Sequence, residues 1–156
     1  MKIATFNING IKARLPRLIE WLEETRPAVA CLQEIKTQDE GFPAGDFEAI
    51  GYSAIWHGQK SFNGVAILVD ARAGYTLTEV QRGLGIPGPN EGDEEQARYL
   101  EADVSGVRVA CLYLPNGNPH PGRSSPTSWR GWRSCASGWR RSGPRKCLRW
   151  YWAIST

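Results

Sequence analysis

The final 37 residues of this 156-residue chain contain no aspartate and no glutamate. All 16 acidic residues lie within residues 1–119, where they outnumber the 11 Lys and Arg. Residues 120–156 carry eight Lys and Arg and five of the seven Trp. This segment therefore cannot supply a carboxylate that binds a metal or transfers a proton. A basic, aromatic tail on an acidic domain is typical of a nucleic-acid-binding arm, which is one interpretation of it.

Paired metal-binding cysteines are also lacking. The four cysteines form no CxxC pair and have no histidine at ligand spacing, which argues against a zinc site. Cys31 and Cys111 each lie in an apolar run, where a free cysteine acts as a small core residue. No run reaches transmembrane length, and the N-terminus lacks the apolar segment of a secretory signal. We therefore expect a reduced, cytoplasmic protein.

Short apolar runs surround one amphipathic segment in the first part of the chain. Residues 2–7 predict a strand that ends at the turn signal NING, and residues 28–34 predict a second, buried strand. Between them, apolar residues at helical spacing predict a helix, with Pro16 in its first turn and Arg26-Pro27 at its end. A strand, a helix and a strand in this order indicate an α/β layered domain.

Three more strands are predicted further along the chain. They cover residues 64–70, 97–104 and 107–115, and Ser105-Gly106 predicts a hairpin between the last two. Residues 83–95 are rich in Gly, Pro and acidic residues and predict a loop. The chain shows no internal repeat.

Polar residues follow the predicted strands at their ends. Asn7 closes the first strand, Glu34 closes the second, and Tyr113 and Asn116 end the last one. A carboxylate with a few oxygen ligands is how proteins usually hold Mg²⁺, and a phenol or the nearby Lys36 could contact a phosphodiester. Taken singly, such an asparagine is more often a turn residue and such a glutamate more often a surface charge, whereas together at three strand ends they favour a site more strongly. Their spacing alone does not identify a reaction.

Five separated motifs in one order make the chain resemble a known family. They are FNINGIKAR, LQEIK, GYSAIWHGQKSFNGVAIL, ARYLEADV and LYLPNGNP. Over residues 1–119 they closely resemble bacterial exonuclease III and the apurinic/apyrimidinic (AP) endonucleases of the endonuclease–exonuclease–phosphatase superfamily. The resemblance implies the N-terminal half of a DNase I-like α/β sandwich of two sheets with outer helices. It also implies a monomeric DNA-repair enzyme that uses Mg²⁺ (or Mn²⁺) to hydrolyse double-stranded DNA at abasic sites and from 3′ ends.

The resemblance also assigns roles to matching positions. Asn7 and Glu34 match the metal end of the family's site, and Tyr113 matches its active-site tyrosine, which contacts the phosphate. For binding of DNA and phosphate we add Lys36, which follows the metal glutamate, together with Arg98 and Asn116. Asn63 and His57 lie in matching loops, where a structural role is at least as good an explanation. The family's GDxN motif, a later aspartate and a C-terminal histidine are missing from this sequence.

Residues 120–156 have a second interpretation, a shifted reading frame. If each codon began one base earlier, the codons of Trp150 to Ala153 would be forced to read Val-Leu-Gly, and the following residues permit the missing GDxN motif. We favour this interpretation over a genuine DNA-binding arm. It predicts an aberrant tail after an exonuclease III-like portion at residues 1–119, with little or no nuclease activity and poor solubility. The alternatives are another phosphatase or phosphodiesterase of the superfamily, or a non-catalytic DNA-binding fragment.

Overall fold

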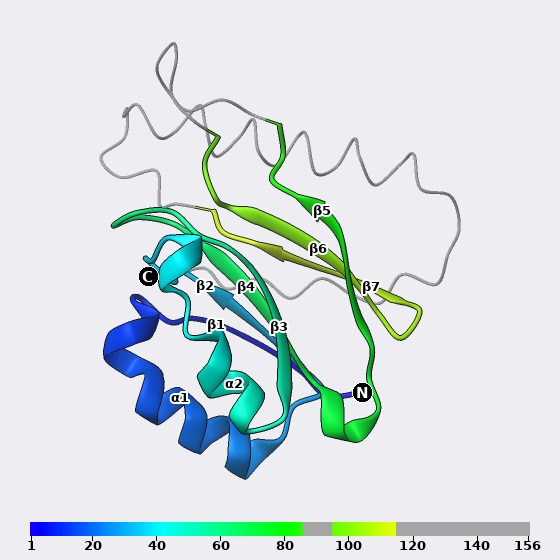
Figure 1. Cartoon of the computed structure of the whole chain (residues 1–156). Coiled ribbons are helices and arrows are strands. Elements are labelled where there is room, and N and C mark those ends of the chain that lie inside the picture. Colours follow the sequence, from blue (N-terminus) through cyan, green and yellow to red (C-terminus); the bar gives the residue numbers. More distant parts are fainter. Residues whose placement is uncertain (86–94, 115–156) are drawn as a thin grey trace.

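The computed structural model describes residues 1–85 and 95–114, and these form two β-sheets packed face to face. Two helices cover the outer face of the first sheet, so the order of layers is helix, sheet, sheet (Figure 1). This arrangement confirms the predicted α/β sandwich. The part of the chain assigned to a shifted frame, residues 120–156, lies outside the described residues.

The first sheet has four strands in the order β1-β2-β4-β3. They are β1 (Ile3–Asn7), β2 (Val29–Gln33), β3 (Tyr52–His57) and β4 (Val65–Asp70). β1 and β2 are parallel, and the other neighbours are antiparallel. Every residue of β2 and β4 is buried, because helices cover one face and the second sheet covers the other. The parallel pair brings the carboxyl ends of β1 and β2 to the same edge.

Two α-helices lie against this sheet: α1 (Ile11–Thr25) and α2 (Ala44–Ala49). α1 begins five residues before Pro16, so the expectation that this proline occupies the first turn was wrong. The helix extends towards the NING turn because Ile11 is fully buried in the core. It ends as expected at Arg26, whose left-handed backbone (φ 45°) lets its N–H bond to the carbonyl of Leu22.

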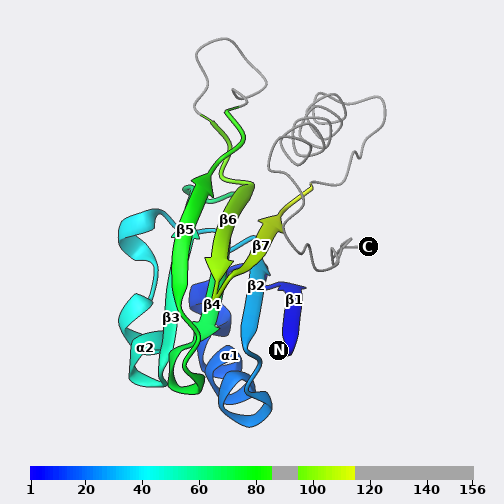
Figure 2. The same cartoon turned by 90° about the vertical axis from the view of Figure 1, so that its right-hand side faces the viewer.

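The second sheet has three antiparallel strands in the order β5-β6-β7. They are β5 (Leu77–Arg82), β6 (Tyr99–Val104) and β7 (Val107–Leu112). The predicted hairpin between β6 and β7 is confirmed, and its turn places Ser105 and Gly106 at positive φ. In Figure 2 the two sheets stack with β5 beside β3 and β7 beside β2, which matches their contacts.

Apolar side chains fill both spaces between the layers. One cluster lies between the helices and the first sheet, and the other lies between the two sheets. Cys31 and Cys111 are buried in the second cluster, as the sequence predicted for core thiols. Short 3₁₀ helices, η1 (Asp39–Gly41) and η2 (Ala71–Ala73), follow β2 and β4.

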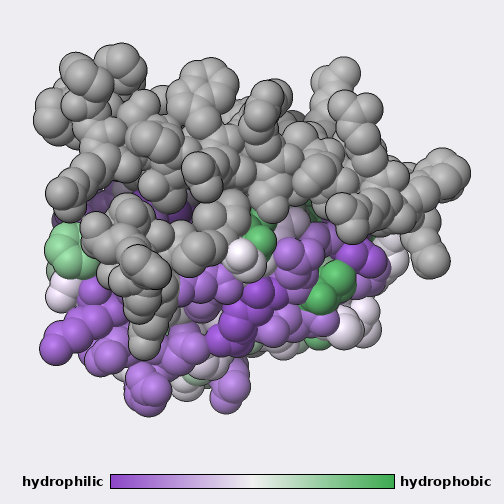
Figure 3. Space-filling model, turned by 90° about the horizontal axis from the view of Figure 1, so that it is seen from above, coloured by the Kyte–Doolittle hydropathy of each residue, from purple (hydrophilic) through white to green (hydrophobic). Residues whose placement is uncertain are grey.

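Seen from above, hydrophobic residues are only scattered across the part that is coloured (Figure 3). Within residues 1–85 and 95–114, no helix combines the length and the apolar character that crossing a membrane requires.

Candidate active site

The carboxyl ends of β1 and β2 place Asn7 and Glu34 side by side. Asn7 pairs with Gln33 in the parallel register, and Glu34 is the next residue after β2. Glu34 has a left-handed backbone (φ 54°), as does Lys36 (φ 50°). Residues with side chains hold this conformation only where the surroundings fix it. Here the Gly10 N–H donates to the Glu34 carbonyl at 2.8 Å, which ties the turn after β1 to the turn after β2.

The Glu34 carboxylate is the centre of the site. Its Oε1 accepts hydrogen bonds from Asn7 Nδ2 at 2.8 Å and from the Tyr113 hydroxyl at 2.7 Å. Its Oε2 pairs with Lys36 Nζ at 2.9 Å. Burial raises the pKa of Glu34, but the hydrogen bonds from Lys36, Asn7 and Tyr113 outweigh burial and hold it below its ordinary value. Glu34 is therefore an anion at neutral pH.

Tyr113 reaches this carboxylate from the other sheet. It follows β7, and its N–H donates to the carbonyl of Arg98 at 2.8 Å. Burial and the neighbouring Glu34 raise the pKa of Tyr113 to about 12. Its hydroxyl therefore stays protonated at neutral pH and can donate a hydrogen bond to an anion. The site thus depends on both sheets being packed together.

Arg98 lies next to Tyr113, with its guanidinium carbon 6.0 Å from the centre of the tyrosine ring. Its Nε donates to Asn63 Oδ1 at 3.3 Å. Burial lowers the pKa of Arg98, which shows that the guanidinium is partly removed from water. The structure therefore brings together five of the six predicted site residues, whereas Asn116 lies outside the described residues.

Two further asparagines join the site: Asn9, which the sequence did not single out, and Asn63, for which a structural role was at least as good an explanation. Asn9 Oδ1 accepts from Lys36 Nζ, and the carbonyl of Asn9 accepts from Arg14. Asn63 contacts Arg98 through its side chain and Lys36 through its backbone carbonyl. Both residues have positive φ values, and each is the asparagine of an Asn-Gly pair, Asn9-Gly10 and Asn63-Gly64, which is a turn signal in the sequence.

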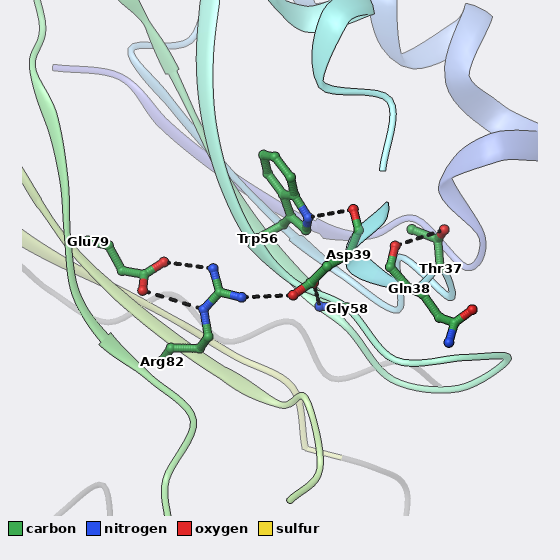
Figure 4. Close-up of polar contacts among 7 residues, drawn as sticks. All are labelled: Thr37, Gln38, Asp39, Trp56, Gly58, Glu79 and Arg82. Atoms are coloured by element: carbon green, nitrogen blue, oxygen red, sulfur yellow. Dashed lines mark hydrogen bonds and ion pairs between the residues drawn. The ribbon is translucent and has the colours of Figure 1, made fainter. Parts of the chain in front are cut away.

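An ion-pair cluster fixes the segment that follows Lys36 (Figure 4). Asp39 accepts from the Gly58 N–H at 2.6 Å and from Arg82 Nη1 at 2.9 Å, and its carbonyl accepts from Trp56 Nε1 at 3.1 Å. Gly58 is required here, because a Cβ at that position would lie 2.4 Å from the carbonyl oxygen of Thr37. Arg82 belongs to β5, so this cluster also joins the two sheets.

The donor set around Glu34 suits a hard divalent cation. An ionised carboxylate beside an amide supplies oxygen ligands, and Mg²⁺ takes few protein groups because it keeps several waters. In this structure three hydrogen-bond donors, from Asn7, Tyr113 and Lys36, contact the carboxylate and balance its negative charge. Within residues 1–85 and 95–114 there is no cluster of three or more His, Cys, Asp or Glu that could form a complete protein cage.

Known proteins are similar to this chain in sequence. Residues 4–146 match the model of the Endonuclease/Exonuclease/phosphatase family. The chain is 38% identical over 121 residues to exodeoxyribonuclease III of Haemophilus influenzae, a match that covers 75% of this chain and 42% of that protein. The chain therefore spans less than half of that relative's length.

Two experimental structures are similar in fold. An AP endonuclease from Archaeoglobus fulgidus gives a TM-score of 0.79 at 30% identity, covering 92% of this chain and 52% of that one. A 3′ phosphatase from Neisseria, bound to a product DNA hairpin, gives 0.74 at 31% identity, covering 90% and 51%. Because the family model matches most of the sequence and the fold agrees, the chain belongs to the Endonuclease/Exonuclease/phosphatase family.

Proposed function

We propose that this chain carries the metal-binding and phosphate-binding part of a DNA-repair phosphodiesterase of the exonuclease III type. Its substrate is double-stranded DNA with abasic sites or 3′ ends, its cofactor is Mg²⁺ (or Mn²⁺), and it acts as a monomer. The observation that carries the proposal is the Glu34 carboxylate, which contacts Asn7, Lys36 and Tyr113 from both sheets. The similarity to exodeoxyribonuclease III supports the choice of substrate.

The described residues divide the work between metal and phosphate. Asn7 and Glu34 would hold the divalent cation, which when bound would polarise the phosphodiester and stabilise the leaving oxygen. Tyr113 has a single O–H, which donates to Glu34 in this structure and would turn to a non-bridging phosphate oxygen when metal and DNA bind. Lys36 and Arg98 supply positive charge on either side of that position, and Asn116 is proposed as a further phosphate contact.

Metal binding by the purified chain tests this proposal directly. The EPR signal of free Mn²⁺ should fall when the chain is added, and Glu34→Gln should restore most of that signal. Glu20→Gln is the matched control, because Glu20 is exposed on α1. A Glu34→Gln variant that binds Mn²⁺ as well as the parent does would contradict the proposed metal site.

Cleavage is a separate measurement with a separate expectation. No group that activates water has been identified among the described residues, so we expect little or no hydrolysis of an abasic duplex by this chain in Mg²⁺. Clear Mg²⁺-dependent cleavage that disappears in Glu34→Gln would overturn this expectation and strengthen the assignment of the site.

A second candidate is a phosphatase that acts on DNA 3′ ends. The similarity to a Neisseria 3′ phosphatase bound to a DNA hairpin favours it. The same cluster would then face a terminal phosphate instead of an internal one. Comparing a 3′-phosphorylated hairpin with an abasic duplex as ligands in Mg²⁺ separates the two, because each candidate predicts tighter binding of its own substrate.

The shifted reading frame stays a proposal for residues 120–156. Resequencing the gene around the codons of Asn118 to Arg123 tests it. A recovered frame that contains GDxN and a C-terminal histidine would restore the family's missing groups. An unchanged nucleotide sequence, together with salt-sensitive DNA binding that is lost on deletion of residues 120–156, would favour the basic arm instead.

A further inference from the structure

We propose that Gln59 and Asn63, in the loop between β3 and β4, are positioning residues that hold Arg98 in place for phosphate. This inference rests on the proposed function, because Arg98 is taken as a phosphate contact. Neither residue reaches the Glu34 carboxylate itself. They act through a chain of hydrogen bonds that runs from Gln59 to Asn63 to Arg98.

Both polar atoms of the Asn63 side chain form hydrogen bonds. Its Nδ2 donates to Gln59 Oε1 at 2.8 Å, and its Oδ1 accepts from Arg98 Nε at 3.3 Å. A donor on one side and an acceptor on the other define the orientation of the amide. The side-chain oxygen Oδ1 of Asn63 is thereby directed at the guanidinium of Arg98.

Gln59 connects the two sheets. Its Oε1 also accepts from the N–H of Ala97, at 3.3 Å, immediately before Arg98. The Gly64 N–H donates in turn to the carbonyl of Ala97 at 2.8 Å. The loop of the first sheet is thus joined to the start of β6 through both backbone and side chain, and Arg98 cannot shift without disturbing this contact.

The backbone of the loop supports the same conclusion. Ser61 has φ 64° and Asn63 has φ 49°; asparagine adopts such values more readily than most residues, and the contacts at both ends of its side chain hold Asn63 there. The backbone carbonyl of Asn63 also accepts a hydrogen bond from the backbone N–H of Lys36 at 3.1 Å. One residue therefore sets the positions of two cations, Arg98 through its side chain and Lys36 through its backbone.

Within the part of the chain that the structure describes, the Nη groups of Arg98 make no hydrogen bond. Asn63 occupies Nε–H, while the Nη groups form the fork that binds phosphate oxygens in pairs. A guanidinium held at Nε and packed against the Tyr113 ring loses little further freedom when phosphate binds. Losing Asn63 should therefore weaken phosphate binding although Asn63 need not touch DNA.

A double-mutant cycle tests whether Asn63 acts through Arg98. The affinity of the full chain for a fluorescent DNA hairpin is measured at low salt by anisotropy. Arg98→Ala should weaken binding about 10-fold or more, the effect of losing a charged hydrogen bond. Asn63→Ala should weaken it about 5-fold, and the double variant should bind like Arg98→Ala alone, because coupled residues are not additive. Additive losses would overturn the proposal.

A second measurement does not depend on DNA. The ¹⁵N-arginine spectrum shows Nε–H groups, and the Arg98 signal is the one missing from Arg98→Ala. In Asn63→Ala its exchange with water should accelerate by about 10-fold, because the loss of one hydrogen bond changes such an equilibrium by that order. Unchanged exchange would overturn the proposal. Fast exchange in Asn63→Ala, together with a parent that does not bind DNA, would confirm the positioning and reject the proposed function.

Two further variants guard against a trivial loss of structure. Alanine is strained at φ 49°, so Gln59→Ala removes the support without changing that position, and it should give a smaller effect in the same direction. Gln81→Ala is the matched control, because among residues 1–85 and 95–114 the side chain of this β5 residue donates a single hydrogen bond, to the carbonyl of Gly83 at 2.9 Å. It should leave both DNA affinity and the Arg98 exchange rate unchanged.

Discussion

The two sheets of the sandwich are built from different kinds of strand. In the first sheet, β2 and β4 are buried along their whole length, since helices and the second sheet cover opposite faces. In the second sheet, β7 alternates between buried and more exposed residues, and β5 is exposed over five of its six residues. Apolar burial therefore stabilises β2 and β4 more than β5 and β7, whereas β6, with four of its six residues buried, is closer to the first pair. The second sheet contributes one inner face, and its outer face can change at little cost.

The candidate site depends on both sheets in spite of this difference. Glu34 follows a fully buried strand, whereas Tyr113 and Arg98 flank strands of the half-exposed sheet. The buried sheet fixes the carboxylate, and the other sheet brings the phenol and the guanidinium to it. Substitutions can therefore separate stability from site geometry.

The largest effect is expected from a core truncation in the first sheet. Leu68 of β4 is fully buried against the helices, so Leu68→Ala should lower the free energy of unfolding by about 2–5 kcal/mol. Val80 of β5 is 41% exposed, so Val80→Ala should change it by no more than about 0.5 kcal/mol. Urea denaturation of the two variants measures the difference. Equal losses of unfolding free energy in the two variants would show that β5 is covered in solution and that β4 and β5 do not differ in burial.

A smaller effect, dependent on pH, is expected from Tyr52. Burial raises the pKa of Tyr52 to about 12, and its hydroxyl donates to the carbonyl of Pro27 at 3.0 Å. Tyrosines of the unfolded chain ionise near pH ~10, so the unfolded state releases this proton first. The stabilisation is complete below pH ~10 and is lost as the pH rises towards 12. Tyr52→Phe should therefore flatten the fall in stability above pH ~10, and an unchanged slope would contradict the assignment.

A comparable loss is expected where the sheets meet at the site. Tyr113→Phe removes the 2.7 Å bond to Glu34 and should cost about 1 kcal/mol at neutral pH. The pKa of Glu34 is lowered in the folded state, so its stabilisation is present above its ordinary pKa and is lost as the pH falls through the folded value. The cost of Tyr113→Phe should therefore shrink in acid. A cost that is the same at pH ~3 and pH ~7 would show that the bond does not depend on the charge of Glu34.

What the sequence could predict follows the same division between the sheets. β2 and β4 were predicted because strands buried on both faces are nearly continuous apolar runs, and the β6–β7 hairpin was predicted from Ser105-Gly106. β5 was missed because its exposed residues have no apolar alternation, and backbone pairing with β6 holds it. β3 was also missed, since its residues follow no clear pattern.

The site was predictable where residues end strands and not where loops meet. Asn7 and Glu34 lie at the ends of neighbouring parallel strands, so sheet geometry makes them neighbours, and Tyr113 at the end of β7 joins them because the two sheets pack together. Asn63 and Arg98 are 35 positions apart, and they meet only because the β3–β4 loop of one sheet lies against the start of β6 in the other. No local pattern records a hydrogen bond between two loops of different sheets. The resemblance placed Asn63 in a matching loop, but only the packed structure shows its bond to Arg98.

The smallest effect is expected on the outer face of the second sheet. Arg108 of β7 pairs with Glu101 of β6 at 2.7 Å, and the arginine side chain is 39% exposed. Solvent screens such pairs, so Arg108→Ala should cost about 0.2–1 kcal/mol. This cost should fall further at about 1 M salt, where screening acts within roughly 3 Å. Arg17→Ala, on the exposed side of α1, is the matched control for the loss of an arginine. A loss as large as that of Leu68→Ala, or one that salt does not reduce, would mean that this face is shielded from water, and the two sheets would then be alike in burial.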